Sequence, residues 1–489
     1  MSQLQAGSEH GLGGRGGLGL AAILVLSALL KLALLAPAHQ TIPIGDARDY
    51  LVAARSFEAG EYTSIRPPLW PAALWLASEI AEATGGPEAR TPIVEILPGG
   101  RSDPRGPLSD LDWARLLMVA MSTLSVWLVF LLGRELLDVR SGLVGAALFA
   151  FDPVFVGYTH LLWAETQFTL LNLAWALLLV LGVKRERLGL LCAAGLLLGA
   201  AALTRQLIMS FSIVAAAWIF LVQPHPPWRA ARMAAAFALF SLLAIAPWTI
   251  RNAVVHERFV PIAPIFGWSL LHGVSDDVAG EVVRAGIAAG VNREQPIPPI
   301  ETERLARERA LAIIAEDPGG YAARMVTVNL PDTWKLGSRV LEHLRYGEGA
   351  GVTRQHGYGP VPSWLGLGLV ALVCGVYGLG MVAGLIGLAV APRWRETLLV
   401  GGLLLHSCAL NAIVGDTVRH RLYVMPFVLL YAGFALSRRR SEWRTLLTRG
   451  RVAVAAALLG VFVLLLAAAD HGELREQWLH FRVRAQIAG

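Results

Sequence analysis

Long apolar runs constrain this chain more than any other feature of its sequence. Eleven stretches approach or reach the roughly 20 apolar residues that cross the hydrocarbon core of a bilayer. A mean hydropathy of +0.54 with only 16% charged residues excludes an ordinary water-soluble protein. We therefore predict an all-α polytopic membrane protein whose spans lie at residues 17–36, 113–133, 142–156, 166–183, 188–203, 207–222, 230–248, 364–390, 397–414, 422–436 and 452–469.

The placement of basic residues predicts the orientation of these spans. The net charge is +6, and arginine gathers in alternate short loops, at residues 134–140, 184–187, 229–232, 393–395 and 438–451. Short loops rich in Lys and Arg face the cytoplasm. We therefore expect a cytoplasmic N-terminus, two long external loops and an external C-terminus. Because the positive charge follows the topology, it does not indicate a nucleic-acid partner.

The runs divide the chain into five parts. The run at 17–36 is longer than a usual signal-peptide core, and we expect it to be retained as a membrane helix. We predict a disordered cytoplasmic N-terminus at 1–16, seven spans at 17–248 with a catalytic first external loop at 37–111, a mainly helical external domain at 249–363, four spans at 364–469 and an external tail at 470–489.

The first external loop carries two segments with the periodicity of one-sided helices. Residues 46–58 place Tyr50, Leu51, Ala54 and Phe57 on one face, and the segment is too short to span a membrane. A helix in the membrane interface is therefore expected. Pro67 and Pro68 can open a second interfacial helix, whose buried stripe is predicted to contain Trp70, Leu74, Ala77 and Ile80. Lys31, near the outer end of the first span, is expected to snorkel toward the headgroups.

Ionisable residues concentrate in the turns predicted to be external. Examples are Asp46, Glu165, Arg205 and Arg419. An arginine at the edge of a membrane is unfavourable unless it meets a carboxylate, water or a phosphate. Each of these arginines has two open interpretations, a ligand for a phosphate group or an interfacial side chain that snorkels. The two acids have alternatives as well, because Asp46 can cap its helix and Glu165 can complement the dipole of the span it precedes.

Six motifs in this order resemble the GT-C superfamily of membrane glycosyltransferases. They are G-D-A-R-D-Y at 45–50, R-P-P-L-W at 66–70, W-A-E-T at 163–166, L-T-R at 203–205, P-W-T-I-R-N at 247–252 and D-T-V-R-H-R-L-Y at 416–423. The resemblance is to bacterial relatives of protein O-mannosyltransferases and aminoarabinose lipid A transferases, which are similar to glycosyltransferase family 39. It implies a multi-pass protein of the bacterial inner membrane, with an external active site and a sugar donor carried on polyprenyl phosphate.

The resemblance also implies roles for particular residues. Asp46 is the expected catalytic base, because a carboxylate can accept the proton of an attacking hydroxyl. Ala47 stands where many relatives have a second acid, which leaves that role to Asp49 or Glu165. Arginine suits the leaving phosphate because its guanidinium stays charged beside lipid. The expected substrate-binding residues are Tyr50, Arg66, Arg205, Arg251, His272 and Arg419, with a structural role open for His272.

The expected function is an inverting transfer of sugar from the lipid donor to a glycan, lipid or protein acceptor. A divalent cation, Mg²⁺ or Mn²⁺, is left open, with Asp46 and Glu165 as the available ligands, although their spacing is not diagnostic. Two alternatives from other classes remain. One is a transporter or flippase of lipid-linked sugars, and the other is a non-catalytic envelope assembly protein that acts through residues 249–363.

Overall fold

The computed structural model describes residues 14–39, 46–58, 60, 62, 64–91, 109–223, 226–277, 280–282, 299–341, 363–415, 418–472, 474–475 and 478–479. All regular elements within these residues are helices. Several predictions lie outside the described residues: the character of residues 1–13, the parts of the external loops at 92–108, 283–298 and 342–362, Asp416, and most of the tail.

The predicted spans are found as helices. Seven helices are long and apolar enough to cross a membrane: α1 (Gly14–Ala33), α6 (Asp110–Leu136), α9 (Glu165–Lys184), α12 (Pro227–His256), α19 (Ser363–Val390), α20 (Trp394–Val414) and α23 (Arg449–Ala468). Shorter apolar helices occupy the other four predicted positions: α7 (Val139–Ala150), α10 (Leu188–Thr204), η2 with α11 (Gln206–Ser210 and Phe211–Val222) and α21 (Met425–Leu436). The all-α membrane fold is therefore confirmed.

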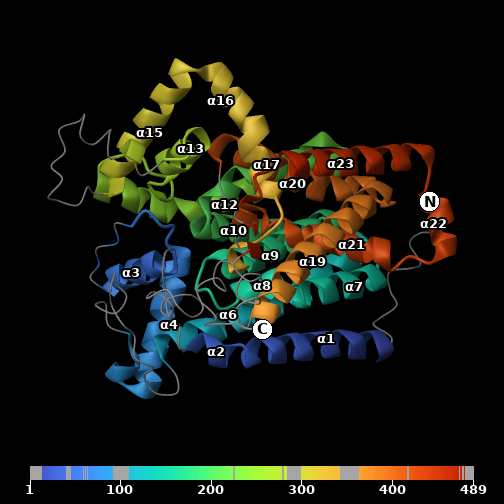
Figure 1. Cartoon of the computed structure of the whole chain (residues 1–489), viewed down its shortest axis with the longest axis horizontal. Helices are drawn as coiled ribbons and strands as arrows, with labels where there is room; N and C mark the ends of the chain where they lie inside the picture. The colour runs from blue at the N-terminus through green and yellow to red at the C-terminus, as the bar shows by residue number, and fades with distance from the viewer. Residues whose placement is uncertain are drawn as a thin grey trace.

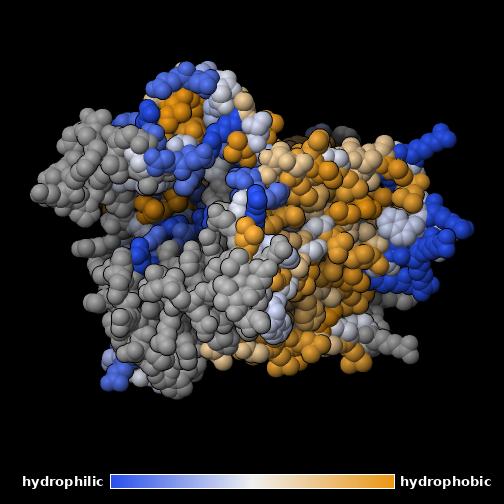
Figure 2. Space-filling model, in the orientation of Figure 1, coloured by the Kyte–Doolittle hydropathy of each residue, from blue (hydrophilic) through white to orange (hydrophobic). Residues whose placement is uncertain are grey.

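The remaining helices cover the two ends of this bundle. They are α2 (Leu35–His39), α3 (Asp46–Glu58), α4 (Leu69–Gly85), η1 (Pro87–Ala89), α8 (Pro153–Tyr158), α13 (Phe266–Val274), α15 (Pro299–Glu316), α16 (Pro318–Arg324), the π-helical η3 (Met325–Asn329), α17 (Leu330–Trp334), η4 (Val418–Arg421) and α22 (Arg440–Leu446). Helix α22 lies at one end, and α3, α4, α13 and α15 lie at the other, which we call the α3 end (Figure 1). Hydrophobic side chains cover the bundle between the two ends, and hydrophilic ones gather at the α22 end (Figure 2).

Small residues let the central helices approach closely. Helix α7 packs against both α6 and α21. A Cβ added to Gly433 of α21 would lie 2.7 Å from the Cα of Gly145 in α7, so only glycine fits this contact. At the α3 end, α6 starts with a capping box in which the Ser109 side chain accepts from the backbone N–H of Asp112 and the Asp112 carboxylate accepts from that of Ser109.

Helices α13, α16 and η3 are fixed to the end of α20. Asn329 of η3 donates to the carbonyls of Ala412 (2.8 Å) and Gly273 (2.9 Å). The hydroxyl of Tyr321 in α16 donates to the carbonyl of Ile413 at 2.8 Å. These bonds reach the last turn of α20, directly before the turn that leads to η4. The position of η4 is therefore tied to α13, α16 and η3.

Two local predictions were wrong. Ile80 is 38% exposed, and Ala81 is buried with Trp70, Leu74 and Ala77, because the buried face of a helix advances by 3.6 residues per turn and reaches 81 rather than 80. Lys31 does not snorkel, since it is 1% exposed and its Nζ donates to the Ser27 hydroxyl at 2.8 Å. Ser27 in turn donates to the carbonyl of Ala150, so a neighbouring helix supplies the polar environment.

Candidate active site

Helix α3 places two carboxylates beside each other at the α3 end. Its buried face, which includes Ala47, Tyr50 and Ala54, packs toward α4. Asp46 and Asp49 both lie in its first turn. Residues three apart in a helix share a face. Both side chains therefore reach the same partner, Arg66, in the segment before α4.

Arg66 joins the two acids. The Nη2 atom of Arg66 donates both to Asp46 Oδ1, at 2.6 Å, and to Asp49 Oδ2, at 2.8 Å. The guanidinium also lies over the ring of Tyr50, with its Cζ 5.2 Å from the ring centroid. The backbone of this segment is held by the Tyr62 hydroxyl, which donates to the Arg66 carbonyl at 2.7 Å. Arg66 is thus positioned by both its side chain and its main chain.

A second arginine binds Asp46 from a distant part of the chain. The Nη1 of Arg419, in η4, donates to Asp46 Oδ2. Burial opposes ionisation of Asp46, but attraction to Arg419 and Arg66 is stronger, and the pKa of Asp46 lies well below its usual range. The pKa of Arg66 is raised, because attraction to Asp46 exceeds the effect of burial. These groups are charged at neutral pH.

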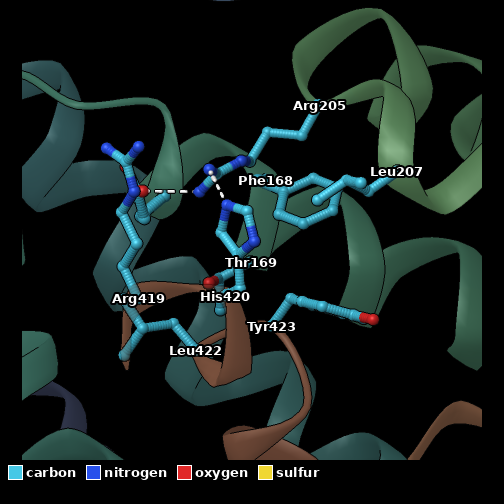
Figure 3. A pocket seen from close by; sticks show the side chains of 9 residues that line it. Phe168, Thr169, Arg205, Leu207, Arg419, His420, Leu422 and Tyr423 are labelled. Carbon is cyan, nitrogen blue, oxygen red and sulfur yellow. Dashed lines mark hydrogen bonds and ion pairs between the residues drawn. The ribbon is translucent and has the colours of Figure 1, made fainter. Parts of the chain in front are cut away.

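Beside this cluster lies a second set of polar groups. Glu165 starts α9, and Arg205 follows the last residue of α10. Arg205 Nη1 donates to Glu165 Oε1 at 2.5 Å, and its Nη2 lies 3.0 Å from His420 Nε2. In Figure 3 the side chains of Arg205 and His420 approach each other, with Arg419 next to them. Five separate segments therefore supply the two clusters: α3, the residues before α4, the start of α9, the residue after α10, and η4.

Side chains from both clusters line open space, although Asp46 and Asp49 themselves line neither of the two cavities. A cavity of about 70 Å³ is lined by residues that include Tyr50, Arg66, Arg205 and Arg419. A smaller adjoining space of about 10 Å³ is lined by Glu165, Phe168 and Tyr423 among others; Figure 3 shows Phe168 and Tyr423 there. Arg205, Leu207, Arg419 and His420 line both. The arrangement can hold an anion beside a carboxylate at one end of a helical bundle.

Two predicted substrate-binding residues do not line these cavities. Arg251 donates to the carbonyl of Tyr62 at 2.5 Å and lies over the ring of Trp248 at 4.9 Å. Since Tyr62 binds the Arg66 carbonyl, Arg251 supports the backbone near Arg66. His272 is on α13 with an exposed side chain.

His420 is a site residue that the sequence did not single out. The stretch 416–423 is rich in ionisable groups, but its pattern does not tell which of them face inward together. In the structure Arg419 contacts Asp46 and His420 contacts Arg205. Arg421 turns into the core, where it donates to the carbonyls of Thr333, Lys335 and Gly337 and lies over the Tyr377 ring.

The available carboxylates do not form a cation site in this arrangement. No group of three or more His, Cys, Asp or Glu side chains comes together within the described residues. Asp46 and Glu165 are each bound by guanidinium groups. A divalent cation would have to displace these arginines, so no step of the proposed chemistry is assigned to a metal.

Comparisons with known proteins concern the fold and the central part of the chain. Residues 109–250 match the family described as dolichyl-phosphate-mannose-protein mannosyltransferase. The fold is similar to that of the Archaeoglobus fulgidus oligosaccharyltransferase in its apo form, at a TM-score of 0.50 and 15% identity over 95% of this chain and 56% of that chain. The predicted resemblance to the GT-C superfamily is confirmed.

The GT-C likeness is distant in sequence. ArnT from Cupriavidus metallidurans, solved with undecaprenyl phosphate, is similar at a TM-score of 0.37 and 14% identity, over 85% of this chain and 77% of that chain. No curated protein matches the sequence. The chain spans little more than half the length of the archaeal oligosaccharyltransferase. The comparisons therefore support the fold of an integral membrane protein, and they relate residues 109–250 to the mannosyltransferase family.

Proposed function

We propose that this protein is an inverting glycosyltransferase of the bacterial inner membrane. It moves a sugar from a polyprenyl-phosphate donor to a glycan, lipid or protein acceptor on the external side. The proposal rests on the matched family, whose description names a dolichyl-phosphate sugar, and on a carboxylate held between arginines beside an open cavity.

The main structural support for the proposal is a hydrogen-bond donor of Arg66 that lacks an acceptor among the described residues. Its Nε–H is buried and has no hydrogen-bond acceptor in the described part of the chain. A buried N–H without an acceptor is unfavourable by roughly 1–3 kcal/mol. A phosphate oxygen in the cavity would supply that acceptor, and guanidinium groups bind phosphate through paired N–H donors. Arg66, Arg205 and Arg419 then form the phosphate-binding side of the site.

Charge balance explains how donor binding would activate the base. Three arginines, Arg66, Arg205 and Arg419, contact three carboxylates, Asp46, Asp49 and Glu165. An incoming phosphate competes with Asp46 for Arg66 and Arg419. Since those two contacts lower the pKa of Asp46, loosening them makes its carboxylate a stronger base.

In the proposed transfer Asp46 is the base and the arginines bind the phosphate. The acceptor hydroxyl attacks the anomeric carbon while Asp46 accepts its proton, and the bond from that carbon to the phosphate oxygen breaks. The electron pair leaves with the phosphate, whose developing charge is stabilised by the arginines. Attack from the face opposite the phosphate inverts the anomeric centre.

Mass spectrometry of the cell envelope tests this function without knowledge of the sugar. Lipids, glycans and proteins from cells with and without the gene are compared. We expect one sugar mass to be absent from one class of molecule when the gene is deleted. An unchanged envelope would count against the proposal. Purified protein that moves labelled lipid-linked sugar across a liposome membrane without cleaving it would instead identify a transporter.

A further inference from the structure

A chain of hydrogen bonds continues from the candidate site into helix α20. His420 Nδ1 lies 3.1 Å from Asn411 Oδ1, and Asn411 Nδ2 donates to Ser407 Oγ at 3.2 Å. Asn411 is 2% exposed and Ser407 is fully buried. Neither residue lines the two cavities. The contacts link the interior of α20 to Arg205 through one imidazole ring.

The hydrogen-bond partners of His420 determine which of its ring nitrogens carries the proton. A guanidinium has only donors, so Arg205 must donate to His420 Nε2, which accepts through its lone pair. A neutral ring with a free lone pair on Nε2 carries its proton on Nδ1. That proton faces Asn411 Oδ1, and the amide is oriented by its own bond to Ser407. In this arrangement Arg205 Nη2, His420 Nδ1 and Asn411 Nδ2 each donate one hydrogen bond to the next residue.

We propose that Asn411 is a positioning residue for the proposed sugar transfer. By accepting the Nδ1 proton of His420, it keeps the Nε2 lone pair directed at Arg205. His420 and Glu165 then hold the two Nη atoms of Arg205, and the guanidinium is fixed where it can meet the donor phosphate. This inference rests on the proposed function, since it assigns Arg205 its ligand.

Protonation of the ring breaks this arrangement. A doubly protonated imidazole has no lone pair that can accept a hydrogen bond from Arg205. Its Nε2–H would instead point at the positively charged guanidinium. Among the described residues, the charged and titratable groups that line the cavities with His420 are Arg205, Arg419, Arg66, Glu165, Tyr50 and Tyr423. An uncharged amide at position 411 satisfies the Nδ1 proton without adding a negative charge that would favour the doubly protonated ring.

The test compares Asn411→Asp with the double variant Asn411→Asp/His420→Gln. Sugar transfer by purified, liposome-reconstituted protein is measured from about pH 5.5 to 9. The carboxylate should move the acid limb of kcat/KM to higher pH by about one unit, which lowers kcat/KM roughly tenfold on that limb. Glutamine can offer an oxygen near the position of Nε2 but does not titrate, so the double variant should lose the shift.

Asn172→Asp is the matched control. Asn172 is fully buried in α9 and bonds to Phe168 and Trp175 outside this network. The Asn172→Asp variant shows the general effect of a buried carboxylate. We expect its kcat/KM to depend on pH in the same way as that of the wild type. An Asn411→Asp profile equal to that of wild type, or a shift that persists with His420→Gln, would overturn the inference.

A second measurement separates this inference from the proposed function. Nitrogen NMR of histidine-labelled protein, with the His420 signal assigned by its loss in His420→Gln, reports the tautomer without turnover. We expect Nδ1–H in the wild type and a doubly protonated ring in Asn411→Asp near neutral pH. An Nε2–H tautomer in the wild type overturns the positioning role. If the tautomers are as expected but the wild type transfers no sugar, the proposed function fails and the hydrogen-bond assignment stands.

Discussion

The guanidinium of Arg419 binds the carboxylate of Asp46 although 373 positions separate the two residues. The other oxygen of that carboxylate accepts from Arg66 at 2.6 Å. The part of the chain that runs from α3 to Arg66 therefore meets the turn between α20 and α21 at one carboxylate. A ligand that competes for either arginine changes the environment of Asp46 directly.

Arg419 and Arg421 have different contacts although one residue separates them, and we expect their functions to differ. Arg419→Ala removes a cation that lines the cavity, and we expect the rate of sugar transfer to fall by roughly 10²–10³-fold. Arg421→Met leaves buried carbonyls without a donor, and we expect destabilisation by roughly 2–4 kcal/mol. Thermal unfolding and specific activity of the purified variants distinguish these effects. Equal losses of stability and activity in both variants would contradict the division of roles.

The ion pairs of Asp46 predict how stability depends on pH. Because the pKa of Asp46 in the folded protein is below the unfolded value of about 3.9, its contribution is complete at higher pH. It is lost as the pH falls below about 4 and through the folded pKa. We expect the Tm difference between wild type and Asp46→Asn to be constant from about pH 8 to pH 5. A difference that disappears over that interval would show that the carboxylate is not held ionised.

The second acidic role can be assigned by comparing Glu165 with Asp49. Glu165 is buried and binds Arg205, whereas the Asp49 side chain is 39% exposed and shares Arg66 with Asp46. Solvent weakens the exposed contact. We expect Glu165→Gln to lower kcat/KM by about tenfold or more, and Asp49→Asn to lower it by only a few-fold. The reverse order, measured in one liposome assay, would assign the second acid to Asp49.

A close glycine contact ties α13 to the end of α20, which η4 follows. A Cβ on Gly273 of α13 would lie 2.1 Å from the carbonyl oxygen of Ile413, so Gly273→Ala must displace α13 or the end of α20. We expect a lower Tm and reduced transfer, because η4 follows that end. Gly368→Ala in α19 is the control, since no atom lies within 4 Å of its Cβ. Its effect should be neutral or stabilising by up to about 1 kcal/mol.

Local signals in the sequence were enough to place the first half of the site. Helix α3 covers the predicted range 46–58, because its one-sided apolar pattern is complete within that segment. The role expected for Arg66 came from the resemblance to the GT-C superfamily, in which a basic residue before proline commonly faces the donor phosphate. The apolar runs likewise predicted helices at all eleven positions, seven of them long and apolar enough to cross a membrane, since burial in lipid leaves a signal in the composition of each segment.

The other half of the site depends on the directions in which side chains point, and the local sequence does not encode these directions. Arg419, His420 and Arg421 are adjacent, yet they point to Asp46, Arg205 and the carbonyls near α17. Their divergence arises from the tight η4 turn and from the partners that long-range packing brings to it. The contact between His420 and Asn411 has the same origin, because nothing in α20 marks one buried amide as a partner.

The central claim is that Asp46 is the base in sugar transfer, and one measurement addresses it directly. Cells that lack the gene are supplied with wild-type protein or with Asp46→Asn at equal membrane levels, and their envelope molecules are compared by mass spectrometry. The wild type should restore the missing sugar mass, whereas Asp46→Asn should leave it absent although the variant is folded and inserted. Restoration by Asp46→Asn to near the wild-type amount would contradict the account.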